Sequence, residues 1–367
     1  MKTTSIRWIF TSIALAATAN AAPFLAIGDG AELFVTGVLG IRSDDNVFTD
    51  KVAISDTIFD VTPGLELTFG KDGQVKGKFS LAEAFSNYSD NSKLNTNLFS
   101  GDFGAGYSDG KLKLDFGTGY HELNQNTADI RGLTRRDTFS ANLAGEVEVS
   151  QKTSVSAGYA FTHSNFKRKS YSDSDDYVVP VNFYYKWTEK LDLSLGYQYR
   201  NYQTQIGQDS TDHYFNVGAR GEFSPKLMGK FTVGVTNRKL AKGSDETMLG
   251  LKASLTYELT PKTSLEMGAS NAPDTSPQGL QQKNFALNGS VTSLISDQWK
   301  VTGGLSYRGI NYGTRTDDYV EGTLGATYII NTYVNLVGSY ARRSNSSVIS
   351  TGEFTNNVFS VSANLRY

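Results

Sequence analysis

The chain has 367 residues, of which 12% are aromatic and none is cysteine, and its formal net charge at neutral pH is −2. So small a charge argues against the basic surface of a nucleic-acid-binding protein, and we expect no nucleic acid as a partner. The lack of cysteine removes disulfides as a stabilising device but does not argue against an exported protein.

Residues 1–21 have the pattern of a secretory signal peptide. Lys2 and Arg7 form its basic end, residues 8–17 its apolar run, and residues 19–21 a small-x-small cleavage site. No later segment has the roughly 20 apolar residues that a membrane-spanning helix needs. We expect the signal to be cleaved and residues 22–367 to form the mature domain, with 33 basic against 37 acidic side chains and a net charge of −4.

From about residue 32 onward, segments of alternating polarity follow one another, and the connections between them are in turn tight and loose. The tight connections are rich in the Gly, Pro, Asp and Ser that hairpin turns require, and they lie at residues 71–73, 108–110, 150–152, 188–190, 224–226, 260–262, 296–298 and 331–333. Longer polar connections include residues 122–137, 164–176, 201–212 and 342–353. Short turns on one rim and longer loops on the other are typical of a transmembrane barrel.

The alternating segments number about 18, each roughly 9 to 12 residues long, which suits a tilted membrane-spanning strand. In residues 191–199, for example, Leu and Tyr occupy every odd position. The sequence therefore predicts an all-β fold, a transmembrane antiparallel up-and-down barrel with both ends at the periplasmic rim. Sixteen strands are the alternative, because residues 263–271 are short and the following loop carries Pro273 and Pro277. A soluble β-propeller or β-sandwich is the other reading of such a pattern.

Glycines and aromatic residues recur with this pattern. One glycine falls in every second strand, at Gly119, Gly158, Gly196, Gly234, Gly268, Gly304 and Gly338, as is expected where a sheet curves strongly. Aromatic residues are expected to form two interfacial belts. The turn-side belt would be Tyr107, Tyr185, Trp187, Phe223, Tyr257, Trp299 and Tyr328, and the loop-side belt Tyr120, Phe161, Tyr199, Tyr202, Tyr214, Tyr307 and Tyr319.

The last eleven residues, 357–367, read as one strand that ends on an aromatic residue. Phe359, Leu365 and Tyr367 lie on its apolar parity, and serine and asparagine fill most of the other. Such an ending resembles the terminal strand of outer-membrane barrels, which implies recognition by the barrel-assembly machinery. These three residues are the predicted assembly signal.

The polar face of the strands carries charges of both signs in nearly equal number. Buried charges need partners in a dry core but are natural in a water-filled lumen. The candidate pore-lining residues are Lys113, Asp115, Glu146, Lys186, Arg200, Arg220, Lys230, Lys252, Glu266, Lys300, Arg308 and Glu321. Tyr184 and Tyr214 are on the same face and could stack on sugar rings. A lumen closed by salt bridges is the alternative that the sequence leaves open.

No pattern in the sequence indicates an enzyme. The chain has no HExxH motif, and its Gly-x-Ser-x-Gly string at residues 106–110 runs into a tight hairpin turn rather than the strand-to-helix elbow of a hydrolase. Its three histidines, His121, His163 and His213, are scattered near the loop ends of strands. Asp212 precedes His213 directly, so the two side chains should point to opposite faces. We expect no catalytic residue, no cofactor and no metal.

The opening of the mature chain resembles the putative β-barrel porin 2 family, which includes outer-membrane proteins of exopolysaccharide operons. The residues concerned are 43–48, Ser-Asp-Asp-Asn-Val-Phe, and 56–65, Asp-Thr-Ile-Phe-Asp-Val-Thr-Pro-Gly-Leu. The resemblance implies an outer-membrane barrel that passes a sugar polymer outward and works with a polysaccharide secretion system.

These observations predict an outer-membrane pore for diffusion or export of a saccharide polymer or another polar solute. The alternatives are a structural or surface-interaction barrel that does not conduct and, less favoured, an outer-membrane enzyme. Its surroundings would be outer-membrane lipid and lipopolysaccharide, which the basic residues of the loops, Lys167, Arg168, Lys169, Arg131, Arg135 and Arg136, could touch.

Overall fold

The computed structural model describes residues 22–28, 30–126, 130, 132–243, 245–349 and 352–367. The expected signal peptide and Arg131 lie outside these residues. The described chain is almost entirely β-strand, with one short 3-10 helix, η1 (Ser92–Leu94). No helix in it is long and apolar enough to cross a bilayer.

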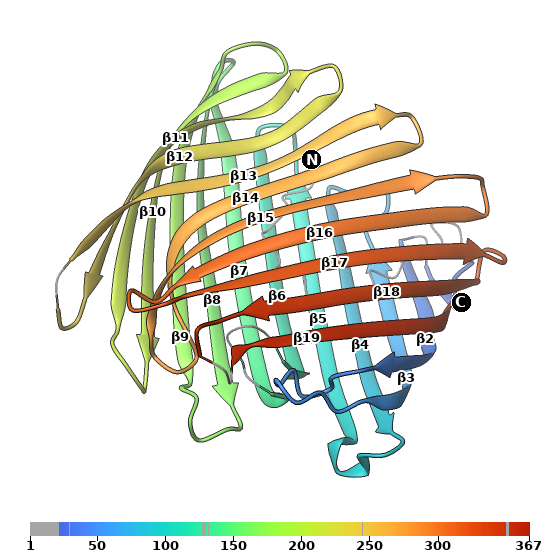
Figure 1. The fold of residues 1–367 in the computed structure, drawn as a ribbon. Coiled ribbons are helices and arrows are strands. Elements are labelled where there is room, and N and C mark those ends of the chain that lie inside the picture. Colours follow the sequence, from blue (N-terminus) through green and yellow to red (C-terminus); the bar gives the residue numbers. More distant parts are fainter. Residues whose placement is uncertain (1–21, 29, 127–129, 131, 244, 350–351) are drawn as a thin grey trace.

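The strands follow one another along the chain with few residues between them (Figure 1). In the first half they are β1 (Leu25–Ile27), β2 (Ala31–Asp44), β3 (Asp56–Phe69), β4 (Val75–Tyr88), β5 (Thr96–Ser108), β6 (Leu112–Gln125), β7 (Thr134–Ser150), β8 (Thr153–Phe166), β9 (Ser174–Lys186) and β10 (Leu191–Thr204). In the second half they are β11 (Ser210–Ser224), β12 (Leu227–Leu240), β13 (Glu246–Thr260), β14 (Thr263–Thr275), β15 (Gln281–Leu294), β16 (Trp299–Asn311), β17 (Thr316–Ile329), β18 (Val334–Ser346) and β19 (Phe354–Arg366).

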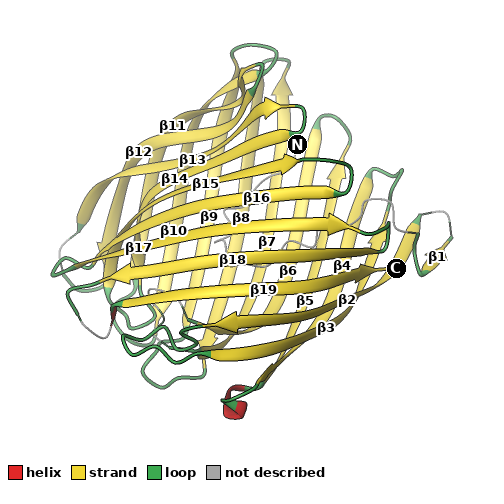
Figure 2. Ribbon diagram, turned by 45° about the vertical axis from the view of Figure 1, so that its right-hand side comes forward, coloured by secondary structure: helices red, strands yellow, loops and turns green. Residues whose placement is uncertain are grey.

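Each strand from β2 to β18 pairs antiparallel with the next strand in sequence, and β19 pairs with β2. The sheet thus closes on itself as an 18-stranded barrel (Figure 2). The predicted fold class is confirmed, and the alternative of 16 strands is wrong. β14 was the uncertain strand, and it runs through Pro273 to Thr275 because it keeps its pairing with β15 there.

All eight predicted tight turns join neighbouring strands. In several of them the first polar side chain accepts backbone N–H groups two and three residues later, which fixes the turn. Asp109 accepts from Lys111 and Leu112 in this way, and Thr188 accepts from Lys190 and Leu191. The hairpin register therefore follows from local chemistry.

The strands of the barrel, at 13 to 17 residues, are longer than the predicted 9 to 12. The predicted loops are correspondingly too long: that at 201–212, for example, shrinks to residues 205–209 between β10 and β11. Apolar alternation marks only the part of a strand that faces lipid. Toward the loops both faces of the strand are polar while the backbone pairing continues. The alternation of polarity alone therefore predicted strands that are too short.

The barrel closes at a seam that includes a strand absent from the sequence-based prediction. Tyr367 exchanges both backbone hydrogen bonds with Val35 of β2, and β1 pairs with β2 just beyond that point. The ring of Tyr367 contacts Phe24 and Tyr333, at centroid distances of 6.1 and 5.2 Å. Both ends of the described chain therefore lie at the tight-turn rim. Three residues are too few for β1 to show a recognisable period.

The outer face of the barrel is covered by exposed apolar side chains. Leu195, Leu249, Leu305 and Leu324 are each more than 60% exposed, and they hold the parity predicted for the apolar face. A continuous apolar surface of this kind fits contact with lipid. Aromatic pairs such as Trp299 with Tyr328, with ring centroids 4.9 Å apart, lie beside the tight turns.

The loop-side belt needs a correction. Tyr202 and Tyr214 are buried, at 9% and 5% exposed, and the hydroxyl of Tyr319 donates to Glu321 two residues further on the inner face. These three tyrosines face inward. Nearness to a loop placed them in the belt, but residue parity decides the face.

Most of the recurring glycines lie on the inner face, where the side chain of a neighbouring strand covers them. A Cβ at Gly196 would come within 2.5 Å of the Asn182 side chain and 2.7 Å of that of Asn216. The glycine thus lets two amides lie flat against the wall. Gly338 is the exception, because it shares the outward parity of Leu336 and Tyr340.

Candidate functional site

The lumen is the candidate site, and its wall is formed by the inward parity of all 18 strands. The structure places every one of the twelve pore-lining candidates on the parity opposite to the exposed apolar residues, as cross-strand pairs such as Lys113 with Glu146 and Arg308 with Tyr319 illustrate. Their part in conduction stays a prediction. The structure adds that three of them, Glu146, Arg200 and Arg220, belong to ion-paired networks.

Two networks lie at the tight-turn end. Arg220 donates to both carboxylate oxygens of Glu146, at 2.5 and 2.7 Å, and to Asp192 at 3.0 Å. Arg366 in turn donates to Glu66, which also pairs with Lys78 at 2.6 Å. Because every arginine has a carboxylate partner, these networks carry little net charge into the lumen.

Between the two ends, small uncharged residues fill much of the inner face. Examples that follow one another around the barrel are Gly117 beside Asn142, Ser156 beside Asn182, Gly196 beside Asn216, Gly268 beside Asn288 and Gly304 beside Thr323. We call this belt the neutral waist. It presents amide and hydroxyl groups to the lumen.

Two lysines lie on the inner wall of β12 and β13: Lys252 borders the neutral waist, and Lys230 lies opposite Arg220 at the tight-turn end. Lys252 donates to Gln198 at 2.8 Å and lies 5.3 Å from the ring of Tyr214. Lys230 lies 3.5 Å from the hydroxyl of Tyr184. Among the described residues, neither ammonium group has a carboxylate within 4 Å.

The expectation that Tyr184 and Tyr214 stack on sugar rings is wrong. Tyr184 is 3% exposed, and the guanidinium of Arg220 covers its ring at 3.4 Å. Tyr214 is similarly buried, with Lys252 over it. Cations occupy these ring faces, so they are not available to a solute.

A third network lies at the loop end, on β9 to β14. Arg200 pairs with Asp176 at 2.8 Å and with Asp274 at 3.0 Å. Arg238, 2% exposed, binds Asp212 through two hydrogen bonds of 2.7 and 3.1 Å. The periodicity assigned Arg200 and Arg238 to the inner face, but it gave no sign that Asp274 would reach Arg200.

The loop between β2 and β3, residues 45–55, also folds into the mouth; we call it the β2–β3 loop. Its Val47 packs on the inward side chains of Ile58 and Tyr88 in a buried cluster. Asn126, four strands away beyond β6, donates to the carbonyl of Val47 at 3.0 Å. This loop contains part of the segment on which the family resemblance rests, and its inward fold was not predicted.

The three histidines do not come together. His121 faces inward and pairs with Asp102 at 3.1 Å, while His163 binds Asp175 and His213 binds the hydroxyl of Tyr197, each at 2.8 Å. Asp212 points to Arg238 on the other face, as predicted. Among the described residues no group of three His, Cys, Asp or Glu side chains is placed to hold a metal.

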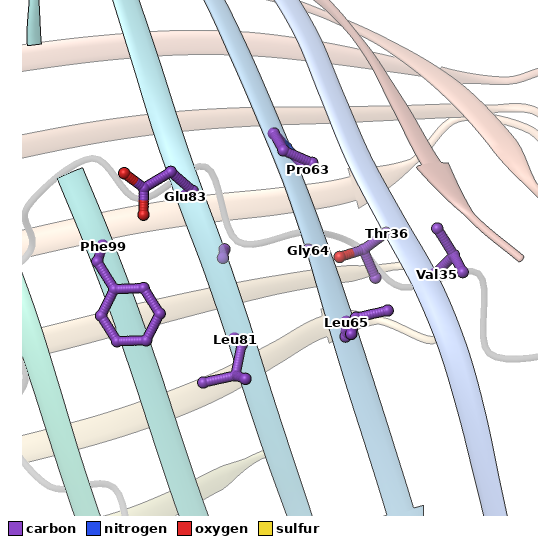
Figure 3. A pocket seen from close by; sticks show the side chains of 9 residues that line it. Val35, Thr36, Pro63, Gly64, Leu65, Leu81, Glu83 and Phe99 are labelled. Atoms are coloured by element: carbon purple, nitrogen blue, oxygen red, sulfur yellow. The ribbon is translucent and has the colours of Figure 1, made fainter. Parts of the chain in front are cut away.

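A groove of about 410 Å³ lies on the outer wall rather than in the lumen. It forms where Pro63, which has no N–H to donate, leaves Thr62 and Pro63 of β3 unpaired with β4. Figure 3 shows Glu83 and Phe99 along one side of it and Val35 along the other. Its mainly apolar lining on the lipid-facing side fits contact with acyl chains, so we do not regard it as a solute site.

The basic residues of the loops are partly neutralised. Lys167 pairs with Asp137 at 2.5 Å, and this hydrogen-bonded carboxylate raises the pKa of Lys167. Arg135 pairs with Glu122 at 3.0 Å. Contact with lipopolysaccharide stays a prediction, and so does recognition of Phe359, Leu365 and Tyr367, whose side chains are exposed on the outer face.

Comparison with known proteins supports the porin-like reading. The model of the family described as Putative beta-barrel porin 2 matches residues 198–367, whereas the residues that carry the predicted resemblance, 43–65, precede that range. No curated protein matches the chain.

Several solved structures are similar to this chain, one of them at a TM-score above 0.5. Pseudomonas aeruginosa OccK2 (OpdF) is 9% identical at a TM-score of 0.51, covering 92% of this chain and 98% of its own. Pseudomonas aeruginosa OpdL is 12% identical (TM-score 0.48; 93% and 99% covered). A bacterial polysaccharide outer membrane secretin is 8% identical (TM-score 0.41; 93% and 100% covered). The chain is thus a porin-like outer-membrane barrel whose residues 198–367 match the Putative beta-barrel porin 2 family, the family that its sequence was predicted to resemble.

Proposed function

We propose that the barrel is an open pore through which a saccharide chain, or a polar solute of similar chemistry, diffuses or is exported. The neutral waist carries this proposal. Amide and hydroxyl groups such as those of Asn142, Asn288 and Thr323 can exchange hydrogen bonds with sugar hydroxyls without holding them by charge. A solute that meets only such groups can be bound weakly and released.

The strand number and the ion-paired networks support the same reading. Barrels of 16 to 18 strands leave an aqueous channel, whereas those of eight fill with side chains. Charges of one sign would focus a field and select the opposite ion, but the arginines of the three networks, such as Arg220, Arg200 and Arg366, are paired with carboxylates. We therefore expect weak charge selectivity, tilted slightly toward anions by Lys230 and Lys252.

Single-channel conductance in a planar bilayer tests the proposal. We expect open-state currents with little preference between potassium and chloride, and block by neutral oligosaccharides that grows with their length. Lys252→Gln should reduce the small chloride preference and leave the open-state current nearly unchanged. Currents that no oligosaccharide blocks would exclude the saccharide while keeping the pore.

A barrel that does not conduct is the second candidate, favoured by the β2–β3 loop, which folds into its mouth. Correctly inserted, heat-modifiable barrels that never conduct would establish it. The enzyme reading has a separate test, because an activity lost on changing His121, His163 or His213 would overturn the pore.

A further inference from the structure

β14 separates from β13 at its loop-side end, while β15 stays paired with β16 as far as Lys283 opposite Asn311. β13 pairs with β14 only as far as Leu251 with Asn271, although β13 continues to Glu246 beside β12. β14 nevertheless stays paired with β15 from Ala272 opposite Asn284 to Thr275 opposite Gln281. Residues 272–282 thus extend beyond the pairing with β13 and rejoin the wall at Lys283; we call them the β14–β15 finger.

The contacts of the finger show that it turns inward. Arg200 of β10 donates to the side chain of Asp274 at 3.0 Å and to the carbonyl of Pro273 at 3.3 Å. Arg238 of β12 donates to the carbonyl of Asp274 at 2.6 Å and to Gln281 at 2.9 Å. Both arginines are on the inner face, with up to three strands between them and β14, so these contacts can form only through the interior.

The tip of the finger is fastened to the loops of the facing strands. The N–H of Ser172, between β8 and β9, donates to the carbonyl of Pro277 at 2.8 Å. Gly279 packs so closely on the β10–β11 loop that a Cβ there would come within 2.3 Å of the carbonyl oxygen of Ile206. Only glycine fits there, and its φ of +78° also favours glycine. Contacts with the inner wall and with the facing loops thus hold the finger along its whole length.

We infer that the β14–β15 finger sets the size limit of the pore. Chain packed face to face on a sheet takes up about 10 Å, and the finger occupies that thickness along the inner wall of β10 to β13. The contacts that hold the finger come mainly from charged groups, so the position of the finger depends on Arg200, Arg238 and Asp274. This inference rests on the proposed pore function and adds to it the element that decides which solutes pass.

The first test removes the finger. Residues 273–283 are replaced by Asn-Gly, a two-residue turn suited to joining the cross-strand partners Ala272 and Asn284. Arg200 keeps Asp176, and Arg238 keeps Asp212, so no buried arginine loses its last partner. We expect the conductance to rise about twofold and larger polyethylene glycols to enter, because a layer of about 10 Å is removed from the lumen.

A matched control shortens another loop. Residues 312–315, between the partners Asn311 and Thr316 of β16 and β17, are also replaced by Asn-Gly, and the conductance should stay at the wild-type value. Heat-modifiability of both variants shows that each forms a barrel. Equal conductance of the finger deletion and the wild type would overturn the inference.

A second test avoids deletion. Asp274→Ala removes the carboxylate that Arg200 holds, and we expect a larger or fluctuating current. Adding Ser172→Cys and Pro277→Cys places thiols where the backbones touch, and the chain has no other cysteine. Oxidation should restore the wild-type current and reduction should enlarge it again. Redox-independent currents would count against the finger.

The two proposals fail differently. If neither the wild type nor the finger deletion conducts, the pore itself is wrong. If both conduct with the same size limit and the same block by oligosaccharides, the pore stands and the finger does not determine its size.

Discussion

The β2–β3 loop and the β14–β15 finger both fold into the loop-side mouth, but different interactions hold them. The β2–β3 loop is held by the apolar cluster of Val47, Ile58 and Tyr88 and by neutral hydrogen bonds from asparagine side chains. The finger is held by arginines that bind carboxylates and carbonyls. Ionic contacts respond to salt and to the loss of one partner, whereas apolar packing responds to volume.

This difference indicates a division of roles. Apolar packing excludes water and holds a segment in one position, so the β2–β3 loop belongs to the rigid part of the mouth. Ionic contacts beside a hydrated lumen can be replaced by contacts with water and dissolved ions, so the finger is the part of the mouth that can change position. The β2–β3 loop and the finger should therefore respond differently to substitution and to salt.

The largest effect is expected from Arg238→Gln. Arg238 is 2% exposed and is the shared partner of Asp212, Ser210 and the finger. Its loss leaves a buried carboxylate with a weakened partner, which costs roughly 3 to 5 kcal/mol. The urea midpoint of the barrel in liposomes should fall accordingly. Arg42→Gln, which breaks a half-exposed pair with Asp60, is the control and should cost much less.

Ile58→Ala tests the apolar packing beneath the β2–β3 loop. Ile58 is fully buried, and removing its side chain beneath Val47 should cost about 3 kcal/mol through lost burial and a cavity. We expect residues 45–55 to become sensitive to protease in intact barrels while residues 276–280 remain protected. Cleavage in both segments would mean that the packing of the β2–β3 loop and the position of the finger depend on each other.

Asn356→Ala tests the asparagine hydrogen bonds at the β2–β3 loop. The fully buried Asn356 amide donates to Asp44 at 2.5 Å and to the carbonyl of Asn46 at 3.3 Å. Its loss should lower the free energy of unfolding by about 1 to 3 kcal/mol, since a buried acceptor loses its donor. The change should not alter the conductance, and an altered size limit would show that this loop also determines what passes.

The smallest effect is expected from salt. Raising potassium chloride from 0.1 to 1 M shortens the Debye length from about 10 to 3 Å. A partly exposed pair such as Arg200 with Asp274 should then lose roughly 0.5 to 1 kcal/mol. Hydrogen exchange at the Ser172 N–H, which bonds to the finger, should quicken about two- to fivefold. Exchange at the Val47 N–H, which bonds within the β2–β3 loop, should not change.

Local sequence patterns were enough to assign most of the faces and all eight tight turns, and they limited the number of strands to 18 or 16. Side chains alternate across a strand with a period of two, so the exposed face of Leu195 and the inner face of Arg220 follow from parity alone. The tight turns carry their own side-chain hydrogen bonds, as at Asp109, so hairpin order is also local. The mixed charge of the inner face was therefore readable without the structure.

The tertiary structure decided which inward charges meet. Arg220 and Glu146 are 74 residues apart, as are Arg200 and Asp274, and parity says only that each faces the lumen. Whether they touch depends on how sharply the closed sheet curves and on where β14 leaves β13. Those are properties of the whole ring of backbone hydrogen bonds, and no local pattern encodes them. For the same reason the buried rings of Tyr184 and Tyr214 could not be foreseen.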